Sequence, residues 1–505
     1  MSAADEFLAQ KEKFQLGDLP TEAPHPGTLA LSDWAKADVA QGLRRLREVD
    51  LDALRRIVDL RHELTPFFHE VAETLAAGDR IFLVGCGATG RLSLSLDTLW
   101  RRKYPASDQL RSLMAGGDVA LVHSLEGFED FPDHGARHLA EMGFGPHDLA
   151  VGSTEGGETP YVIGAVEKAA EISRRPPQFL CCNPRGILME KVERSRRVLG
   201  DPRIRSCCLD TGPMALTGST RMQAATVLML AIGLALDFGR DVDRAFAALE
   251  RWIDFLARQE TTLLEPFIVR EAETYLEGGH TIYATDDFAI TVFTDTTERA
   301  PTFNLQPFDA PGAPADRHSL TYLTIPSAPT AEESWRHLLA RVPRPLEWPR
   351  IHPKTTRDYL LSFDFGRNAL AFRRTIPGRL RVFAIDPAGE RLRFRFAGRE
   401  EHFALPKEGA LFDHLTLKLL LNMHSTLVMG RLGRFEGNLM TWVYPSNGKL
   451  IDRAARYTQI LVRRRGRDDF SYDEIVRAQF ACRSEVTPQD SIVHMTIEKL
   501  TGNPA

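Results

Sequence analysis

From Arg80 onward, short apolar runs alternate with amphipathic stretches, and this alternation constrains the fold more than any other feature of the sequence. The runs and the helical patterns between them stand at 81–85, 89–103, 110–117, 148–154, 159–173 and 177–183. Such βαβα alternation predicts a parallel sheet covered by helices on both faces. A second cycle begins near residue 279, with further strands expected at 319–324 and 380–385.

The predicted fold class is therefore α/β, with two doubly wound parallel sheets in tandem and helical segments at both ends. A length of 505 residues suits several domains. We divide the chain into an N-terminal helical segment (1–60), a first α/β unit that binds the ligand (61–250), a second, structural unit (251–410) and a C-terminal helical segment (411–505).

Composition excludes several classes of partner. The formal net charge is -5, and the basic run 463–467 is followed at once by Asp468 and Asp469, so we expect no nucleic-acid partner. No apolar run reaches the roughly 18 residues that cross a membrane. The first residues lack a basic stretch and an apolar core, which predicts a cytoplasmic protein without a signal peptide. The six cysteines show no metal-ligand spacing, so neither a metal nor a cofactor is expected.

A glycine-rich loop follows the strand at 81–85 and opens a helix. Gly85, Gly87 and Gly90 would let the backbone approach a phosphate, and the helix N-terminus supplies N–H groups. Ala88 lies in the same loop, Thr89 adds a hydroxyl, and Arg91 is a candidate for added charge or for a structural role. A dinucleotide site is an alternative, but no acidic residue ends a strand about 20 positions on. A plain tight turn is the other alternative.

A second loop of small and hydroxylic residues ends the strand at 148–154. Ser153, Thr154, Glu155 and Gly156 precede a helix, which makes another anion cradle at a strand end. A third polar turn contains Ser219 and opens an apolar helix expected at 219–238. Ser219 is either a ligand contact or a simple N-cap.

Several motifs share one chain order with a known family. They include Thr21–Glu22, GCGATGRL at 85–92, AGGD at 115–118, EGFED at 126–130, TPYVIGAVEKA at 159–169, CNP at 182–184, GPMALTGSTRM at 212–222, the segment 421–440 and SNGKLIDRA at 446–454. With them the chain resembles the sugar isomerase (SIS) domain family. Within it, the chain is most similar to the branch of the N-acetylmuramic acid 6-phosphate etherases and the glucokinase regulatory protein.

The layout resembles the two-SIS-domain type of this branch, because an insertion from about 240 to 410 separates motifs that are adjacent in the etherases. The resemblance implies a sugar phosphate ligand, either a hexose or an amino-sugar 6-phosphate. It also implies a pseudo-dimer within one chain, hence a functional monomer. In the second unit, 283–288 carries two acidic residues where a cradle would stand. We expect a degenerate domain that closes the first domain's site.

The resemblance also implies a two-carboxylate mechanism, with a base and an acid. Glu129 matches one family glutamate, and Glu126 belongs to the same motif as a ligand contact. The other family glutamate falls at Leu99, which cannot transfer a proton. Glu155 and Glu158 are candidate substitutes. Lys449 matches a ligand-contacting lysine of the regulatory protein and is otherwise a surface residue.

Three functions follow. The first is a sugar-phosphate sensor or regulator with weak or no lyase activity, which Leu99 and the tandem layout favour. The second is an active etherase, or a related sugar-phosphate lyase or isomerase, that uses Glu129. The third is an interaction module that docks a sugar kinase.

Overall fold

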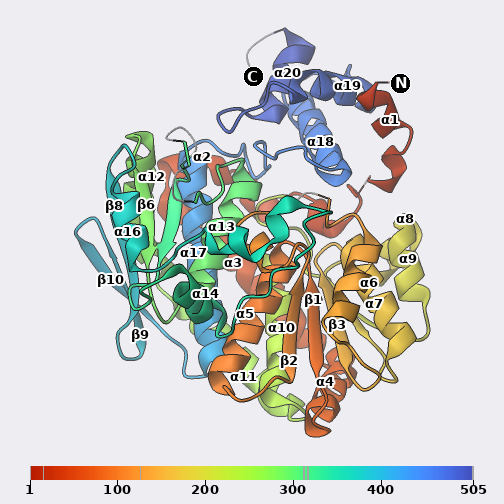
Figure 1. Cartoon of the computed structure of the whole chain (residues 1–505). Helices are drawn as coiled ribbons and strands as arrows, with labels where there is room; N and C mark the ends of the chain where they lie inside the picture. The colour runs from red at the N-terminus through yellow and green to blue at the C-terminus, as the bar shows by residue number, and fades with distance from the viewer. Residues whose placement is uncertain (1, 15, 126, 311–312, 315–317, 503–505) are drawn as a thin grey trace.

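The computed structural model describes residues 2–14, 16–125, 127–310, 313–314 and 318–502, which form two five-stranded sheets (Figure 1). The first sheet has the order β2-β1-β3-β4-β5, and all its neighbouring strands are parallel. Its strands are β1 (Ile81–Gly85), β2 (Leu110–Met114), β3 (Leu149–Thr154), β4 (Gln178–Cys181) and β5 (Arg205–Cys208). Every residue of β1 and β3 is buried, which explains their unbroken apolar runs.

The strand order reverses at β1, which has β2 on one side and β3 on the other. Chains that leave neighbouring strands in opposite directions open a crevice at the carboxyl ends of those strands. The loops after β1 and β3 are the two polar loops singled out in the sequence. The topology thus brings them to one edge of the sheet.

The second sheet has the order β10-β9-β8-β6-β7. Its strands are β6 (His280–Ala284), β7 (Thr321–Thr324), β8 (Leu380–Pro387), β9 (Arg391–Phe396) and β10 (Arg399–Ala404). Only β6, β7 and β8 are parallel, whereas β9 and β10 form an antiparallel hairpin at the edge. The parallel part agrees with the doubly wound sheet expected here, since the strand order reverses at β6, whereas the antiparallel hairpin was not expected. In β9, Leu392, Phe394 and Phe396 are buried and alternate with more exposed arginines, as an edge hairpin with one covered face requires.

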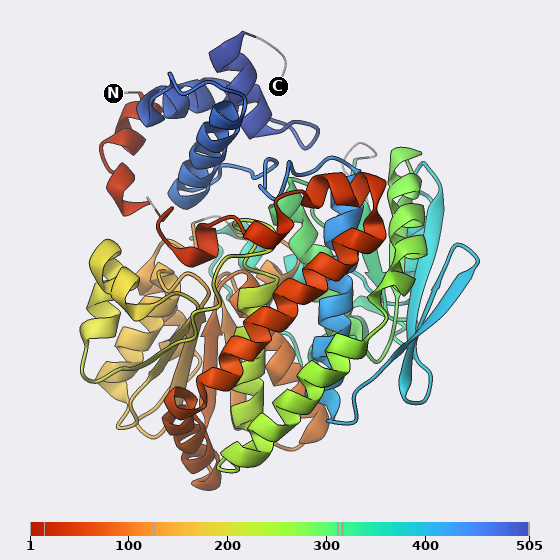
Figure 2. The ribbon, with the colours of Figure 1, turned by 180° about the vertical axis from the view of Figure 1, so that it is seen from behind.

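Helices surround both sheets, and Figure 2 shows α3 crossing the rear of the molecule. Helices before, within and directly after the first sheet are α2 (Leu31–Ala37), α3 (Val39–Asp59), α4 (Arg61–Ala76), α5 (Ala88–Lys103), α6 (Pro132–Glu141), α7 (Pro160–Ile172), α8 (Arg185–Lys191), α9 (Glu193–Gly200), α10 (Gln223–Phe238) and α11 (Val242–Arg258). Those of the second unit are α12 (Glu265–Leu276), α13 (Ala289–Phe303), α14 (Ala331–Leu339), α15 (Arg357–Leu361) and α16 (Arg367–Arg373). Helix α10 begins four residues later than expected, so Ser219 lies in the turn before it.

Helix α17 (Ala410–Arg431) lies at the centre of the molecule. It packs against α2, α3, α10, α12 and α13, and most of its residues are buried. A helix that is apolar on nearly all sides needs such a central position. It joins the helices of the first unit to those of the second.

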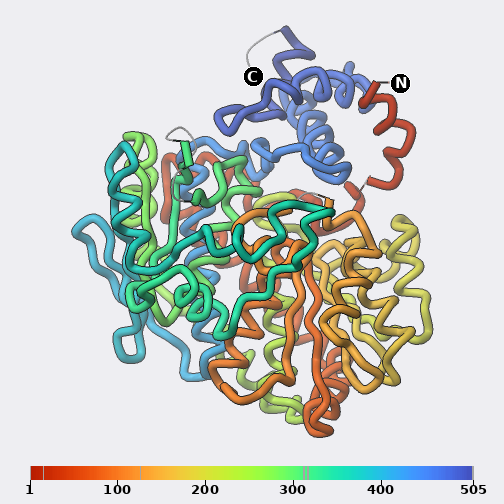
Figure 3. Tube along the Cα trace, in the orientation of Figure 1, coloured from red at the N-terminus to blue at the C-terminus, as the bar shows by residue number. Residues whose placement is uncertain are grey.

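The remaining C-terminal helices form a separate helical cap at one end of the molecule, together with α1 (Ala3–Leu8). They are α18 (Gly448–Arg464), α19 (Tyr472–Arg483) and α20 (Ile492–Thr501). Phe7 packs there with Ile451 and Ile475 in a small second core, so both ends of the chain meet in the cap (Figures 1 and 3). Among the described helices, none is both long and apolar enough to cross a membrane.

Candidate functional site

A cavity of about 450 Å³ opens at the carboxyl ends of β1 and β3, and we call it the loop cavity. Five parts of the chain line it, namely the N-terminal segment, the loops of the first sheet, the turn before α10, helix α13 and the start of the cap. The residues that concern us are Glu22, Gly87, Ala88, Arg91, Glu129, Asp130, Glu155, Gly156, Glu158, Ser219, Arg221, Glu298, Thr302, Lys449 and Arg453. The polar loops predicted from the sequence therefore share one cavity.

The glycine loop needs its glycines for two reasons. Gly87 has φ 55° and ψ -120°, a backbone conformation that residues other than glycine rarely adopt. It precedes the first residue of α5 at the cavity. At Gly85, a Cβ would lie 2.3 Å from the carbonyl carbon of Thr89, so the strand and the helix approach too closely for alanine. Gly90 plays a similar packing role, because its Cβ would lie 2.4 Å from Met114 Cγ. Of the three, Gly87 alone lines the cavity.

Three predicted contacts have hydroxyls that bond within the protein and do not line the cavity. Thr89 Oγ1 accepts from the Cys86 N–H and donates to the Cys86 carbonyl, both at 2.9 Å. Thr154 Oγ1 pairs with Thr159 Oγ1 at 2.8 Å, and Ser153 Oγ donates to the Val84 carbonyl at 3.5 Å. These side chains hold the loops in shape. Glu126 lies outside the described residues.

Lys449 is the central cation of the cavity. Its Nζ lies 2.6 Å from Glu129 Oε1 and 3.5 Å from Glu158 Oε1, so the cap contacts two loops of the first unit. The adjacent carboxylates raise the pKa of Lys449 well above its usual value despite the opposing effect of burial. Lys449 is thus charged at neutral pH. Glu158 also pairs with Arg194, and these cations lower its pKa although burial raises it.

Glu155 is a buried acid of the site without an ion pair among the described residues. It is buried, and its Oε1 has no hydrogen-bond partner among the described residues. Burial raises the pKa of Glu155 to about 7, so this carboxyl holds a proton at mildly acidic pH. Such a group is suited to donate a proton or a hydrogen bond to a ligand oxygen.

Arg91 holds the two units together while it lines the cavity. Its Nη2 donates to the carbonyls of Ala120 and Leu121, and its Nε donates to Thr297 Oγ1 of α13. With 3% of its surface exposed, the guanidinium has a structural role. Burial lowers its pKa from the usual range.

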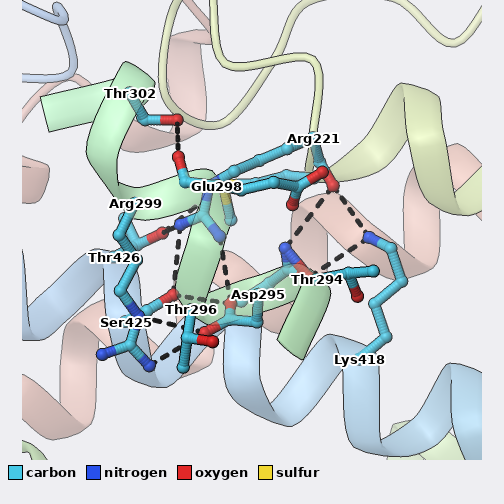
Figure 4. Close-up of polar contacts among 12 residues, drawn as sticks. Arg221, Thr294, Asp295, Thr296, Glu298, Arg299, Thr302, Lys418, Ser425 and Thr426 are labelled. Carbon is cyan, nitrogen blue, oxygen red and sulfur yellow. Dashed lines mark hydrogen bonds and ion pairs between the residues drawn. The ribbon is translucent and has the colours of Figure 1, made fainter. Parts of the chain in front are cut away.

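Sequence reasoning missed the part of the wall that comes from the second unit. Glu298 of α13 lines the cavity beside Arg221, whose Nη1 bonds Asp295 Oδ1 at 3.0 Å (Figure 4). Burial raises the pKa of Glu298, and its carboxylate makes no ion pair in the described part of the chain. Lys418 of α17 lies close by and donates to the Arg221 carbonyl at 2.7 Å. Arg221 belongs to the motif at 212–222, but no motif marked Glu298 or Lys418, since packing of the two units brings them to the site.

Leu99 lies elsewhere. It lines a second cavity, near the other end of α5, and not the loop cavity. A comparison within the chain explains this. Leu99 stands fourteen residues after Gly85, the last residue of β1, and Glu298 stands fourteen residues after Ala284, the last residue of β6. Glu298 therefore occupies in the second unit the position that Leu99 occupies in the first.

The N-terminal segment contributes Glu22 to the cavity. Arg453 donates to its two oxygens at 3.1 and 2.5 Å, and Arg456 donates at 2.9 Å. These two arginines lower the pKa of Glu22 to about 2 against the opposing effect of burial. The pairs fix the cap against the body. No cluster of histidine, cysteine and acidic residues in the described ranges is arranged to hold a metal ion.

Comparison with known proteins agrees with this arrangement. Residues 63–170 match the model of the glucokinase regulatory protein N-terminal SIS domain. The fold and the loop cavity thus define a SIS-domain protein. The chain is 33% identical over 218 residues to an N-acetylmuramic acid 6-phosphate etherase from Synechococcus elongatus, covering 43% of this chain and 66% of that protein.

An N-acetylmuramic acid 6-phosphate etherase from Rippkaea orientalis is 33% identical over 223 residues, or 67% of its length. The chain belongs to the sugar isomerase (SIS) family, on the branch of the N-acetylmuramic acid 6-phosphate etherases and the glucokinase regulatory protein. It spans about two thirds of the length of the etherases that it matches.

Among solved structures, a tagatose-6-phosphate ketose/aldose isomerase from Escherichia coli is similar over 82% of this chain and 95% of its own, with a TM-score of 0.42 and 14% identity. A putative tagatose-6-phosphate ketose/aldose isomerase from Clostridium novyi covers 81% of this chain and 92% of its own, with a TM-score of 0.44 and 12% identity.

Proposed function

We propose that this protein binds a hexose or amino-sugar 6-phosphate in the loop cavity and acts as a sensor or regulator with little lyase activity. The convergence of two loops carries the binding proposal. Gly87 and Ala88 at the start of α5 and Gly156 before α7 line the same cavity. The first N–H groups of a helix have no intrahelical acceptor, so the start of α5 offers donors to a phosphate. Helix α7 begins with Pro160, which has no N–H, and the Tyr161 N–H donates to the Glu129 carbonyl at 3.1 Å, so the second loop contributes through Gly156 rather than through its helix N-terminus.

The charges around these loops suit a sugar phosphate. Lys449 supplies a cation that a phosphate or a ring hydroxyl can share with Glu129. Glu129, Glu155 and Glu298 present carboxyl oxygens that accept bonds from sugar hydroxyls. A ligand with one anionic end and several hydroxyls meets both requirements. The relatives named as etherases of N-acetylmuramic acid 6-phosphate support an amino sugar as one option.

The ion pair of Glu129 supports the regulatory half of the proposal. A base must offer a lone pair to the substrate proton, but Lys449 donates to Glu129 Oε1 at 2.6 Å. Lys449 thus occupies one lone pair of the carboxylate, and a substrate proton would have to approach another. In the bound state we expect the pair to orient a hydroxyl.

An active etherase is the second candidate, and Glu298 is the observation that favours it. Leu99, which stands at the position of a family glutamate, lies outside the loop cavity and so does not bear on catalysis there. Glu298 stands at the equivalent position of the second unit and enters the loop cavity. With Glu129 as the base, Glu298 or Glu155 as the acid would complete a two-carboxylate pair.

Two measurements test these candidates. Isothermal titration with glucose, fructose, glucosamine, N-acetylglucosamine and N-acetylmuramic acid 6-phosphates should give saturable binding by at least one of them. Absence of binding by all would exclude the proposal. Lactate release from N-acetylmuramic acid 6-phosphate should be absent or slow. A multiple-turnover release of lactate that Glu129→Gln abolishes would show that the protein is an etherase and not a regulator.

A sugar kinase as partner would appear as sugar-phosphate-dependent co-sedimentation with a purified hexokinase.

A further inference from the structure

A second cavity of about 740 Å³ lies between the two units, and we call it the junction cavity. Its wall combines the C-terminal half of α5, the connection from α10 to α11, and the starts of α13 and α17. It is larger than the loop cavity, and nothing in the proposed function uses it.

The junction cavity is the counterpart of the loop cavity with the two units exchanged. The loop cavity takes the N-terminus of α5 and the later part of α13. The junction cavity takes Asp287 and Phe288 at the N-terminus of α13 and the later part of α5. The turn 218–221 before α10 has its counterpart in residues 408–411 at the start of α17. The junction cavity is therefore where the second unit would hold a ligand of its own.

Its chemistry does not suit a phosphate. Asp286 and Asp287 occupy the loop after β6, so the cradle has no glycine and carries two negative charges. Leu99 projects into the cavity at the place of Glu298, and Trp100, Phe288 and Leu411 add apolar surface. A cavity with such a floor accommodates an apolar body.

Asp413 is a polar side chain of this cavity that lacks a hydrogen-bond partner on one oxygen. Its Oδ1 is buried and has no hydrogen-bond partner among the described residues. Most other charges of the wall have partners, although the exposed carboxylate of Asp287 makes no ion pair among the described residues. Lys103 bonds Asp237 at 2.8 Å, and Glu408 bonds Arg251 at 2.7 Å, while Arg102 donates to the Asp287 carbonyl. The remaining cation, Arg244, is exposed and lies against the ring of Phe238.

We infer that the junction cavity binds an apolar organic cation, a protonated amine on an aromatic or branched aliphatic body, whose ammonium group pairs with Asp413. The amine supplies the donor that Asp413 Oδ1 lacks, and the apolar body covers Leu99 and Phe288. Burial raises the pKa of Asp413 to about 6, so this carboxyl is mostly ionised in a neutral buffer. The inference is independent of the sugar phosphate proposal.

Isothermal titration of the full chain at neutral pH with 2-phenylethylamine tests it, with 2-phenylethanol as the neutral ligand of nearly equal shape. We expect a millimolar dissociation constant for the amine, at least about fivefold tighter than for the alcohol. Asp413→Asn should remove that preference. Asp469→Asn, an exposed acid of the cap, is the matched control and should leave it unchanged.

Leu99→Trp, which fills the apolar part of the cavity, gives a second test if Asp413→Asn folds poorly. It should weaken both ligands alike. Equal binding of amine and alcohol, amine binding that survives both substitutions, or no binding at all would overturn the inference. Since no sugar phosphate is present, its outcome does not depend on the loop cavity.

Discussion

At the scale of single residues, the shape of the loop cavity depends most on the backbone conformation of Gly87. Gly87→Ala forces a side chain onto φ 55° and ψ -120°, which we expect to cost about 1–3 kcal/mol of stability and to displace the start of α5. Sugar phosphate affinity should fall at least about tenfold. Titration calorimetry of the folded variant measures this loss.

Gly78 provides the control for that substitution. It has φ 78° at the end of α4, and a Cβ there would also meet nothing within 4 Å. Gly78→Ala should therefore lose comparable stability and keep full sugar phosphate affinity. Equal affinity in both variants would remove Gly87 from the site.

Glu155 should make stability fall with rising pH. Burial raises the pKa of Glu155 from 4.5 to about 7, so the folded state holds the proton through a pH range in which the unfolded state releases it. Stability is lost as pH rises through this window, by up to about 3 kcal/mol above pH 7. Glu155→Gln removes the loss, so the variant should be more stable than the parent protein near pH 8 and similar near pH 4.5 in urea unfolding.

Glu158 lies in the same loop and predicts the opposite sign. Its pKa is lowered because Lys449 and Arg194 outweigh its burial, so its contribution is present at neutral pH and lost in acid. Glu158→Gln should therefore destabilise the protein near pH 8. If both variants were destabilised alike, the assignment of Glu155 as an uncompensated acid would be wrong.

At the scale of elements, α5 and α13 each contribute to both cavities, and this gives a prediction about their equivalent residues. Glu298→Gln should weaken sugar phosphate binding about fivefold or more, because Glu298 lines the loop cavity. Leu99→Glu restores a family glutamate in sequence but places it in the junction cavity, so binding should stay within about twofold. Leu99→Met controls for packing. Stronger binding or new lactate release in Leu99→Glu would contradict this assignment.

The elements of the first sheet could be predicted because local patterns fix them. The apolar run at 81–85 forms a wholly buried strand. Gly87, which follows it, has a positive φ of 55°, and glycine is the residue that most readily adopts such a loop conformation. Glu298 could not be recognised in this way. Its own helix gives no sign of a ligand, and its place in the loop cavity depends on how the second unit packs against α5. The one signal in the sequence is the equal spacing of Leu99 from the end of β1 and of Glu298 from the end of β6, which marks them as equivalent positions.

The edge hairpin of the second sheet was missed for a different reason. The alternation of Leu392, Phe394 and Phe396 with charged residues is local, and Gly398 marks a turn with φ 82°. Frequent prolines and charges in the preceding segment made the βαβ pattern hard to follow there. The predicted doubly wound sheet therefore included β9, although its buried and exposed residues alternate with the period of two that indicates an edge strand.

At the scale of the whole molecule, one chain brings both units and the cap to a single loop cavity, which predicts one sugar phosphate per chain. The second unit offers Asp286 and Asp287 at its corresponding loop, and these repel a phosphate. Titration calorimetry should thus give one equivalent for each 56.6 kDa chain, and sedimentation equilibrium should give a monomer with and without ligand. Gly87→Ala should keep this stoichiometry while its affinity is at least about tenfold weaker. Two equivalents, or a ligand-dependent dimer, would mean that the two units do not complete the site within one chain.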